Sequence, residues 1–310
     1  MSRRGGVGPA LSGLTVLSLL LVFGGDEILP GRAFRAFWNL GHIAYFALIA
    51  WLLLQWDALR RQSRWRQWLW VLLASLLIGG VIELLQIGTR RSADLEDILR
   101  DLGGSLLVLA FYPGLLGTGR LLRWGLRGLV LLLLLWELVP FGRALIDTGF
   151  ALRHFPVLAD FSTPFEIDRW SGGAKLEIVE PEDGRPALQM TLLPGDYSGA
   201  SLKDFPGDWR GYDALVIELD LPSEEPLRLT LRVHDRRHES GPRAYAFGDR
   251  FNRSFLLKPG FNRLRIPLEQ IRQAPAGRSM DLGHIVDVTL FASRLKATRD
   301  IVVFSVRLAE

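Results

Sequence analysis

The chain changes its pattern of hydrophobic and polar positions near its midpoint. Up to about residue 141, long leucine-rich runs are separated by short polar segments. Several of these runs approach the roughly 20 apolar residues that a helix needs to cross a bilayer. Beyond residue 156 apolar and polar residues mostly alternate, which is the period of a β-strand with one buried face. We therefore expect an all-α membrane domain followed by an all-β domain.

Five apolar segments in the first half predict five transmembrane helices. They cover roughly residues 9–23, 37–56, 70–88, 98–116 and 121–141. The first segment follows two arginines, as the apolar part of a signal peptide would. The residues after it lack a small-x-small cleavage motif, so we expect it to remain as the first helix.

The arginines between these segments predict the orientation. One group would share a side of the membrane: Arg3, Arg4, Arg60, Arg61, Arg64, Arg66, Arg120, Arg123 and Arg127. Fewer arginines fall in the opposite short loops: Arg32, Arg35, Arg90 and Arg91. Cytoplasmic loops carry the excess of Lys and Arg, so the N-terminus is expected in the cytoplasm and everything after Phe141 outside it.

Ionisable residues inside apolar segments predict a polar pocket. Glu83 lies within the expected third span, and Gln86 lies on the same helix face. A carboxyl at membrane depth is costly unless it faces a partner or a polar cavity, which makes it a functional-site candidate. In the expected topology the pocket candidates converge on the outer membrane face: His42, Glu83, Gln86, Arg91, Asp97 and Asp101.

Simpler roles remain open for these residues. Asp97 could cap a helix and complement its dipole, and His42 could be a hydrogen-bonded packing residue. His42, Glu83 and Asp101 could bind a divalent ion in principle, but no tight ligand spacing supports this. We therefore expect neither a metal nor another cofactor.

The motif around Glu83 resembles that of VanZ-like membrane proteins. It reads Glu-x-x-Gln, a polar turn with Arg, then Asp-x-x-x-Asn-x-x-Gly, with a His beside aromatic residues one helix earlier. The matching residues are His42, Tyr45, Phe46, Glu83, Gln86, Arg91, Asp97 and Gly104. Asp101 stands where the family has Asn, and Trp38-Asn39 replaces its Asp-Lys. The resemblance covers residues 9–116 and implies a bacterial inner-membrane protein in contact with lipid; family members have been linked to glycopeptide-antibiotic resistance.

The second half predicts an antiparallel jelly-roll β-sandwich. Alternating segments cover residues 175–179, 187–192, 214–219, 227–233, 262–266, 286–291 and 301–308. Turns rich in Pro and Gly separate them, and no amphipathic helix intervenes. The expected organisation is a helical domain over residues 1–143, a linker over 144–156 and an exported sandwich over 157–310.

Composition narrows the possible functions. The chain has no Cys, so an exported domain must be stabilised by its core without disulfides. Its net charge of +4 comes largely from arginines that flank apolar segments, where membrane topology explains them. Nucleic acid is therefore not an expected partner.

The sandwich also resembles carbohydrate-binding modules of the galactose-binding-like type. The resemblance rests on residues 160–161, 207–215, 247–251 and 260–268 in that order. It implies a glycan ligand, for which Tyr197 and Tyr245 are the expected stacking platforms. The expected polar partners are Asp235, Asp249 and Arg250.

Other residues of this half are given structural roles. Trp209 and Tyr212 are expected to anchor the core or a turn. His234 and His238 are read as part of a charged turn, since their spacing in a strand-turn context does not aim both at one ion.

The sandwich half lacks a nucleophile elbow, a phosphate-binding Gly loop and a His-Glu-x-x-His motif. We therefore expect an inner-membrane protein that binds or acts on cell-envelope glycans or glycolipids. Two alternatives remain. The pocket around Glu83 could perform acid/base catalysis on a lipid-linked sugar, or the helices could only anchor a protein-interaction module.

Overall fold

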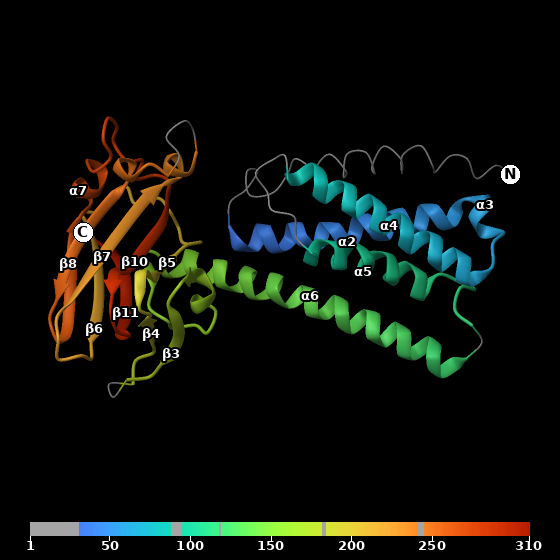
Figure 1. Cartoon of the computed structure of the whole chain (residues 1–310), viewed down its shortest axis with the longest axis horizontal. Coiled ribbons are helices and arrows are strands. Elements are labelled where there is room, and N and C mark those ends of the chain that lie inside the picture. Colours follow the sequence, from blue (N-terminus) through green and yellow to red (C-terminus); the bar gives the residue numbers. More distant parts are fainter. Residues whose placement is uncertain (1–30, 88–94, 118, 182–183, 241–244) are drawn as a thin grey trace. The chain divides into compact units, whose positions relative to one another are not determined.

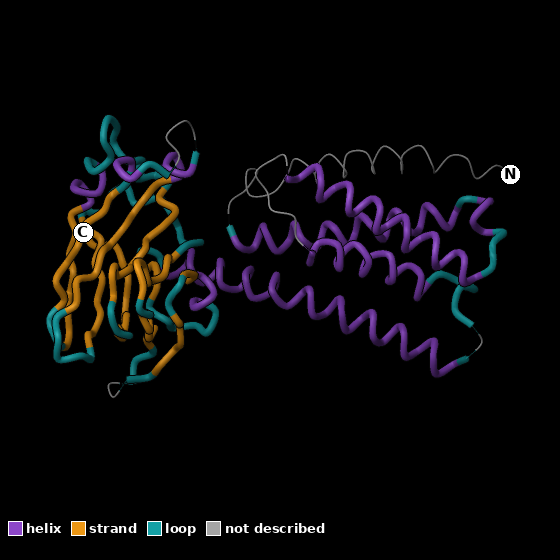
Figure 2. Tube along the Cα trace, viewed as in Figure 1, coloured by secondary structure: helices purple, strands orange, loops and turns teal. Residues whose placement is uncertain are grey.

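The computed structural model describes residues 31–87, 95–117, 119–181, 184–240 and 245–310. The chain divides into two compact units, Met1–Leu145 and Ile146–Glu310. The first is helical and the second is dominated by antiparallel strands, which confirms the predicted change of fold class (Figure 1 and Figure 2).

The helices of the first unit are α2 (Arg32–Gln55), α3 (Asp57–Arg60), α4 (Arg64–Ile87), α5 (Leu95–Phe111) and α6 (Arg120–His154). Among the described residues three helices are long and apolar enough to cross a membrane: Arg32–Gln55, Arg64–Leu85 and Arg120–His154. The structure thus differs from the five expected spans. The first of them lies outside the described residues, and α5 has only 17 residues where a span takes roughly 20.

Small residues let the helices approach one another. A Cβ added to Gly104 on α5 would lie 2.2 Å from the carbonyl oxygen of Ile43 on α2. Aromatic and aliphatic side chains fill the space beside this contact, with Phe46 and Leu109 fully buried. Glycine at position 104 therefore sets how closely α2 and α5 pack.

The second unit is a sandwich of two antiparallel sheets. The first sheet has the order β3 (Lys175–Val179), β4 (Ala187–Leu192), β11 (Arg299–Ala309), β6 (Ala214–Leu221) and β9 (Gly260–Pro267), and β1 (Val157–Ala159) also pairs with β11. The second sheet has the order β2 (Trp170–Gly172), β5 (Gly195–Leu202), β10 (Ile285–Leu295), β7 (Leu227–Asp235) and β8 (Phe251–Leu257).

The core lies between these two sheets. Alternate strand positions supply it, as period-two patterning requires. On β7, for example, Leu229, Leu231 and Val233 are buried. Trp209 is fully buried, which confirms its expected role as a core anchor.

The end of α6 differs from the linker expected over residues 144–156. The helix continues to His154, and its last turns belong to the sandwich unit. Asp147 on α6 makes a buried bidentate ion pair with Arg169, which ends η2 (Glu166–Arg169): Nε lies 2.8 Å from Oδ2 and Nη2 lies 2.7 Å from Oδ1. Arg169 also donates to the carbonyl of Leu158, so it ties helix and strand together.

Candidate functional site

The helical unit contains a buried cluster of ionisable side chains. His42 Nδ1 lies 2.9 Å from Asp101 Oδ1, and His42 Nε2 lies 3.7 Å from Asp97 Oδ2. His42, Asp101 and Glu83 are all at least 95% buried, and Glu83 is near enough for its charge to act on the other two. Gly79 on α4 makes room for this cluster, because a Cβ there would lie 2.4 Å from Asp101 Oδ2.

The structure thus brings together four of the six residues predicted for the helical pocket. Arg91 and the side chain of Gln86 lie outside the described residues. Two further members were not predicted: Arg100 donates to Asp97 at 2.6 Å and to Glu137 of α6 at 2.9 Å. In the described part of the chain, no group of three or more metal-ligating side chains is placed to hold an ion.

A second candidate lies on the sandwich, on the face of the second sheet that points away from the core; we call it the β10 face. Strand alternation directs these residues outward: Tyr197 and Ser201 of β5, Asp287, Thr289 and Phe291 of β10, Thr230, Arg232 and His234 of β7, and Asn252 and Ser254 of β8. The pairing of β10 with β5 and β7 then determines which of these residues are neighbours across the strands. Thr289 lies between Ser201 and Arg232, and Asp287 lies opposite His234.

Asp287 is the centre of the polar groups on the β10 face, although only 1% of it is exposed. Thr289 Oγ1 donates to Asp287 Oδ1, and Arg232 Nη2 donates in turn to Thr289 Oγ1 at 2.8 Å. Lys203 Nζ lies 4.0 Å from Asp287 Oδ2. Among the described groups no donor hydrogen-bonds to that oxygen, and Arg232 Nε and His234 Nδ1 are likewise buried without a hydrogen-bond partner.

Aromatic rings adjoin this polar centre. Tyr197 is 76% exposed, and its ring centroid lies 5.9 Å from that of Phe291. Phe291 sits opposite Gly199, where an added Cβ would lie 2.5 Å from Phe291 Cα. The glycine keeps β5 close to β10, so Tyr197 is an exposed ring backed by two paired strands; its role as a stacking platform stays a prediction.

Asp235 and Asp249 are both held by Arg278, and their expected role in ligand binding stays a prediction. Arg278 reaches both: Nη1 lies 2.6 Å from Asp235 Oδ2 and Nε lies 2.6 Å from Asp249 Oδ1. Burial raises the pKa of Asp235, but the Arg278 hydrogen bond and the N–H of Asp281 outweigh it and lower the pKa overall. The Arg278 hydrogen bond also lowers the pKa of Asp249. Both carboxylates therefore serve to hold the loops at this end of the sheet.

His234 and His238 come together, although their spacing had suggested only a charged turn. The short helix η3 (Arg236–Glu239) folds back so that the two ring centroids lie 4.7 Å apart. His234 Nε2 lies 3.2 Å from Glu239 Oε1, and this contact lowers the pKa of Glu239. Burial, and then the charge of His234, lowers the pKa of His238. The exposed ring of Tyr245 meets His238 edge-on at 5.9 Å.

Arg250 lies at the same end of the β10 face. Its guanidinium stacks over Phe247 at 5.4 Å, and its Nε is buried without an acceptor in the described structure. The charge of Arg232, and then those of Asp287 and the phenol of Tyr197, act on the guanidinium of Arg250, so Arg250 lies within electrostatic range of each of them. The predicted site residues Tyr197 and Arg250 therefore border one polar centre, whose other members are Asp287, Arg232 and His234.

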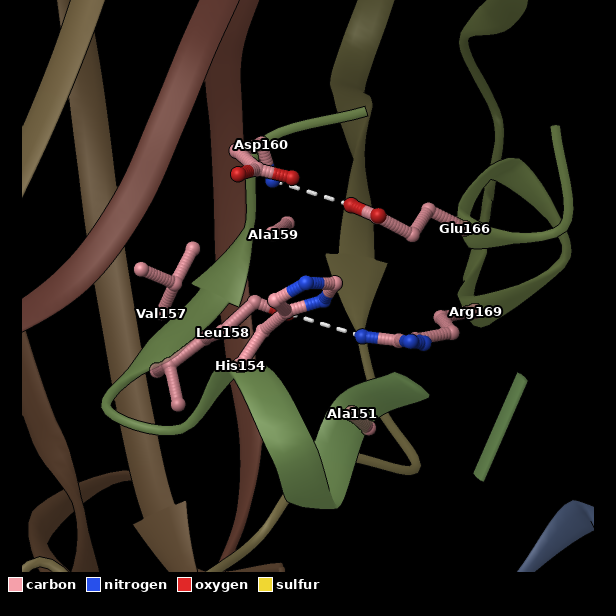
Figure 3. Close-up of a pocket in the computed structure, with 8 residues that line it drawn as sticks. All are labelled: Ala151, His154, Val157, Leu158, Ala159, Asp160, Glu166 and Arg169. Atoms are coloured by element: carbon pink, nitrogen blue, oxygen red, sulfur yellow. Dashed lines mark hydrogen bonds between the residues drawn. The ribbon is translucent and has the colours of Figure 1, made fainter. Parts of the chain in front are cut away.

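A small cavity of about 10 Å³ lies elsewhere in the sandwich unit, lined by Ala151, His154, Val157, Leu158, Ala159, Asp160, Glu166 and Arg169 (Figure 3). Glu166 Oε2 accepts the backbone N–H groups of Asp160 and Phe161 at 2.9 and 2.7 Å. Such a volume suits about one water molecule. We therefore assign it a structural role.

Comparison with known proteins gives a likeness for the sandwich. No model of a known protein family matches the chain, and no curated protein matches it. The β-sandwich is similar to a family 11 carbohydrate-binding module from Clostridium thermocellum solved with a β-1,3-1,4-mixed-linked tetrasaccharide: identity is 17%, the TM-score is 0.38, and the match covers 49% of this chain and 94% of that one.

Two further solved structures show the same likeness. The family 11 module of the cellulase Lic26A-Cel5E of Clostridium thermocellum matches at 18% identity and a TM-score of 0.37, over 49% of this chain and 92% of that one. An exo-β-agarase matches at 15% identity and a TM-score of 0.39, over 49% of this chain and 24% of that one. At TM-scores below 0.5 we take neither ligand nor binding residues from these proteins. The VanZ-like resemblance of the helices stays a prediction.

Proposed function

We propose that the sandwich binds a cell-envelope glycan on its β10 face. The observation that carries this proposal is an exposed ring, Tyr197, on the same face as a buried carboxylate, Asp287, whose Oδ2 accepts no hydrogen bond from the described protein groups. A pyranose has an apolar C–H face that stacks on an aromatic ring and a rim of hydroxyls that donate and accept hydrogen bonds. The β10 face carries both kinds of partner.

The hydrogen-bonding inventory of the polar centre fits this ligand. Asp287 Oδ2 is an acceptor, Arg232 Nε is a donor, and His234 Nδ1 takes either role according to its tautomer. A buried polar group without a partner costs about 1–3 kcal/mol. These atoms are closed to solvent in this structure, so sugar hydroxyls that pair with them would recover part of that cost only if the surrounding side chains move on binding.

Calorimetry on the intact protein in detergent micelles tests this function. Titration with a panel of envelope polysaccharides and peptidoglycan fragments should identify a binding glycan. The variant Tyr197→Ala should then weaken binding at least about tenfold, or ~1.4 kcal/mol. The matched control is Phe261→Ala, because Phe261 is also exposed (59%) but lies on β9 of the other sheet. Equal losses in both variants, or no binding to any glycan, would refute the proposal.

We further propose that the helical unit holds this module at the outer face of the bacterial inner membrane with a cytoplasmic N-terminus. This topology needs five spans, with α5 crossing as a short helix at the lower end of the ~17–25 residues that a span uses. Three described helices of spanning length and composition support this. At 1.5 Å per residue, the 35 residues of α6 extend about 52 Å, beyond the roughly 30 Å of a bilayer core. Reporter fusions should show Ser63 in the cytoplasm and Ala309 outside, and the reverse result would overturn the topology.

A membrane enzyme is the second candidate, and the buried His42–Asp101 hydrogen bond favours it. A carboxylate that orients a histidine is a recurrent arrangement for general acid/base catalysis. This candidate would use the cluster in the helical unit on a lipid-linked sugar. The variant Asp101→Asn should then abolish turnover of such a substrate while the protein still inserts in the membrane; unchanged turnover would exclude the pair from catalysis.

A further inference from the structure

Cationic side chains gather around the polar centre of the β10 face. Arg232 and Lys203 both approach Asp287, and they share this one carboxylate at 3.5 and 4.0 Å. The nearby carboxylate of Glu239 lies 3.2 Å from His234 and is paired there. The positive charge at this centre is thus only partly balanced within the described structure.

Arg250 is the clearest case of an unbalanced charge. None of the described carboxylates lies within ion-pair distance of its guanidinium. The nearby Arg278, by contrast, forms ion pairs with two carboxylates, Asp235 and Asp249. In the described part of the chain, its guanidinium stacks over the ring of Phe247. Burial, and then the positive charge of Arg232, lowers the pKa of Arg250. An arginine nevertheless stays protonated in proteins, so two guanidinium groups repel each other here.

We infer that the glycan bound by the β10 face is acidic, and that its oxyanion pairs with Arg250 and Arg232 while a sugar ring stacks on Tyr197. This inference rests on the proposed function. A guanidinium offers N–H donors in a planar fork that matches the two oxygens of a carboxylate, phosphate or sulfate group. An anion between the two arginines would relieve their repulsion.

The sources of the oxyanion can be separated with matched ligands. Calorimetry on the intact protein would compare oligogalacturonate with its methyl ester, and a sulfated galactan with the desulfated polymer. At least one acidic member should bind about tenfold or more tightly than its neutral counterpart. That preference should shrink as salt is raised, because exposed charges are screened. Equal binding of acidic and neutral partners, or tighter binding of the neutral ones, would overturn the inference.

Variants test the role of Arg250 itself. Arg250→Gln should lower affinity for the preferred acidic glycan about tenfold or more and leave any binding of its neutral counterpart within about twofold. The matched control is Arg228→Gln, because Arg228 is exposed and lies on the same outward face of β7 as Arg232. Arg250→Lys should bind the acidic glycan with an affinity between those of the unmodified protein and Arg250→Gln, since lysine keeps the positive charge but loses the planar fork of N–H donors.

The outcomes separate the two proposals. Loss of acidic and neutral binding together in Arg250→Gln, with the melting temperature unchanged, would mean that Arg250 does not select for charge, and would overturn this inference alone. Failure of every glycan to bind the unmodified protein would overturn the proposed function, and this inference with it.

Discussion

Removing the Asp147 carboxylate should strongly destabilise the sandwich. In the variant Asp147→Ala, Arg169 would lose two charge-assisted hydrogen bonds of 2.8 and 2.7 Å. The side chains of the pair are only 2–3% exposed, so water cannot replace the lost partner without local opening. Breaking a buried pair by removing one partner costs about 3–5 kcal/mol. The last turns of α6 are therefore part of the sandwich fold.

Urea unfolding of a soluble fragment covering residues 143–310 measures this cost. The fragment retains two tryptophans, Trp170 and Trp209, which are both buried in the sandwich core and report on it alone. At a slope of about 2 kcal/mol per M, a loss of about 3–5 kcal/mol lowers the urea midpoint by about 1.5–2.5 M. Arg210→Ala is the control, because it breaks the Arg210–Asp208 pair, which is exposed to solvent.

A midpoint for Asp147→Ala within about 0.5 M of the unmodified fragment would refute this reasoning. The double variant Asp147→Leu with Arg169→Met distinguishes a lost interaction from an uncompensated charge. It should recover much of the stability, since two apolar side chains replace the pair without leaving a charge buried. A fragment that begins at Phe155 should be as unstable as Asp147→Ala or worse.

Three further predictions follow from close packing and from titration. Gly199→Ala should lower the melting temperature of the sandwich fragment, because its Cβ would lie 2.1 Å from a carbonyl oxygen of β10, whereas Gly173→Ala meets nothing within 4 Å and should be neutral. Gly104→Ala should lower the melting temperature of the full chain in detergent, because the added Cβ would force α5 away from α2. Gly103→Ala should not, because a Cβ there meets nothing within 4 Å, and equal melting temperatures of the two variants would contradict this. Burial lowers the pKa of His238 below the unfolded value of about 6.5, so the unfolded chain binds more protons than the folded one near that pH. The free energy of unfolding should therefore fall as the pH is lowered below about 6.5. A free energy of unfolding that stays constant or increases as the pH is lowered from about 7.5 to 5.5 would contradict this.

The strands with alternating core residues could be predicted from the sequence. The expected segments over residues 175–179 and 187–192 coincide with β3 and β4. β5 was missed because small residues fill its inward positions, with Ser198 and Ala200 where larger apolar residues would mark a strand. That strand nevertheless supplies Tyr197 to the candidate site.

The polar centre of the β10 face could not be assembled from single strands. Asp287, Arg232 and His234 come together through the register between β10 and β7, which depends on packing between strands. A signal was present, since Asp287, Thr289 and Phe291 alternate with buried Val288 and Leu290 and so point to one outward face. The prediction instead chose Asp235. On β7 the odd-numbered residues point away from the β10 face, so Asp235 lies on the opposite side of the strand from Arg232 and His234 and pairs with Arg278.

The helical cluster was partly predictable for a different reason. Ionisable residues in apolar segments stand out in a sequence, and His42, Asp97 and Asp101 do meet. Arg100 was missed because an arginine near a helix start suggests an interfacial position. Its ion pair with Glu137 joins α5 to α6, a contact between segments 37 residues apart.

Mapping a bound glycan on the sandwich by NMR tests the central claim most directly. Once calorimetry identifies a ligand, it would be titrated into the isotope-labelled fragment of residues 143–310. We predict that the amide signals of Ser201, Thr230 and Thr289, and the side-chain signal of Arg232, shift together with that of Tyr197. Shifts confined to the outward residues of the first sheet, such as those of β9, would contradict a binding site on the β10 face.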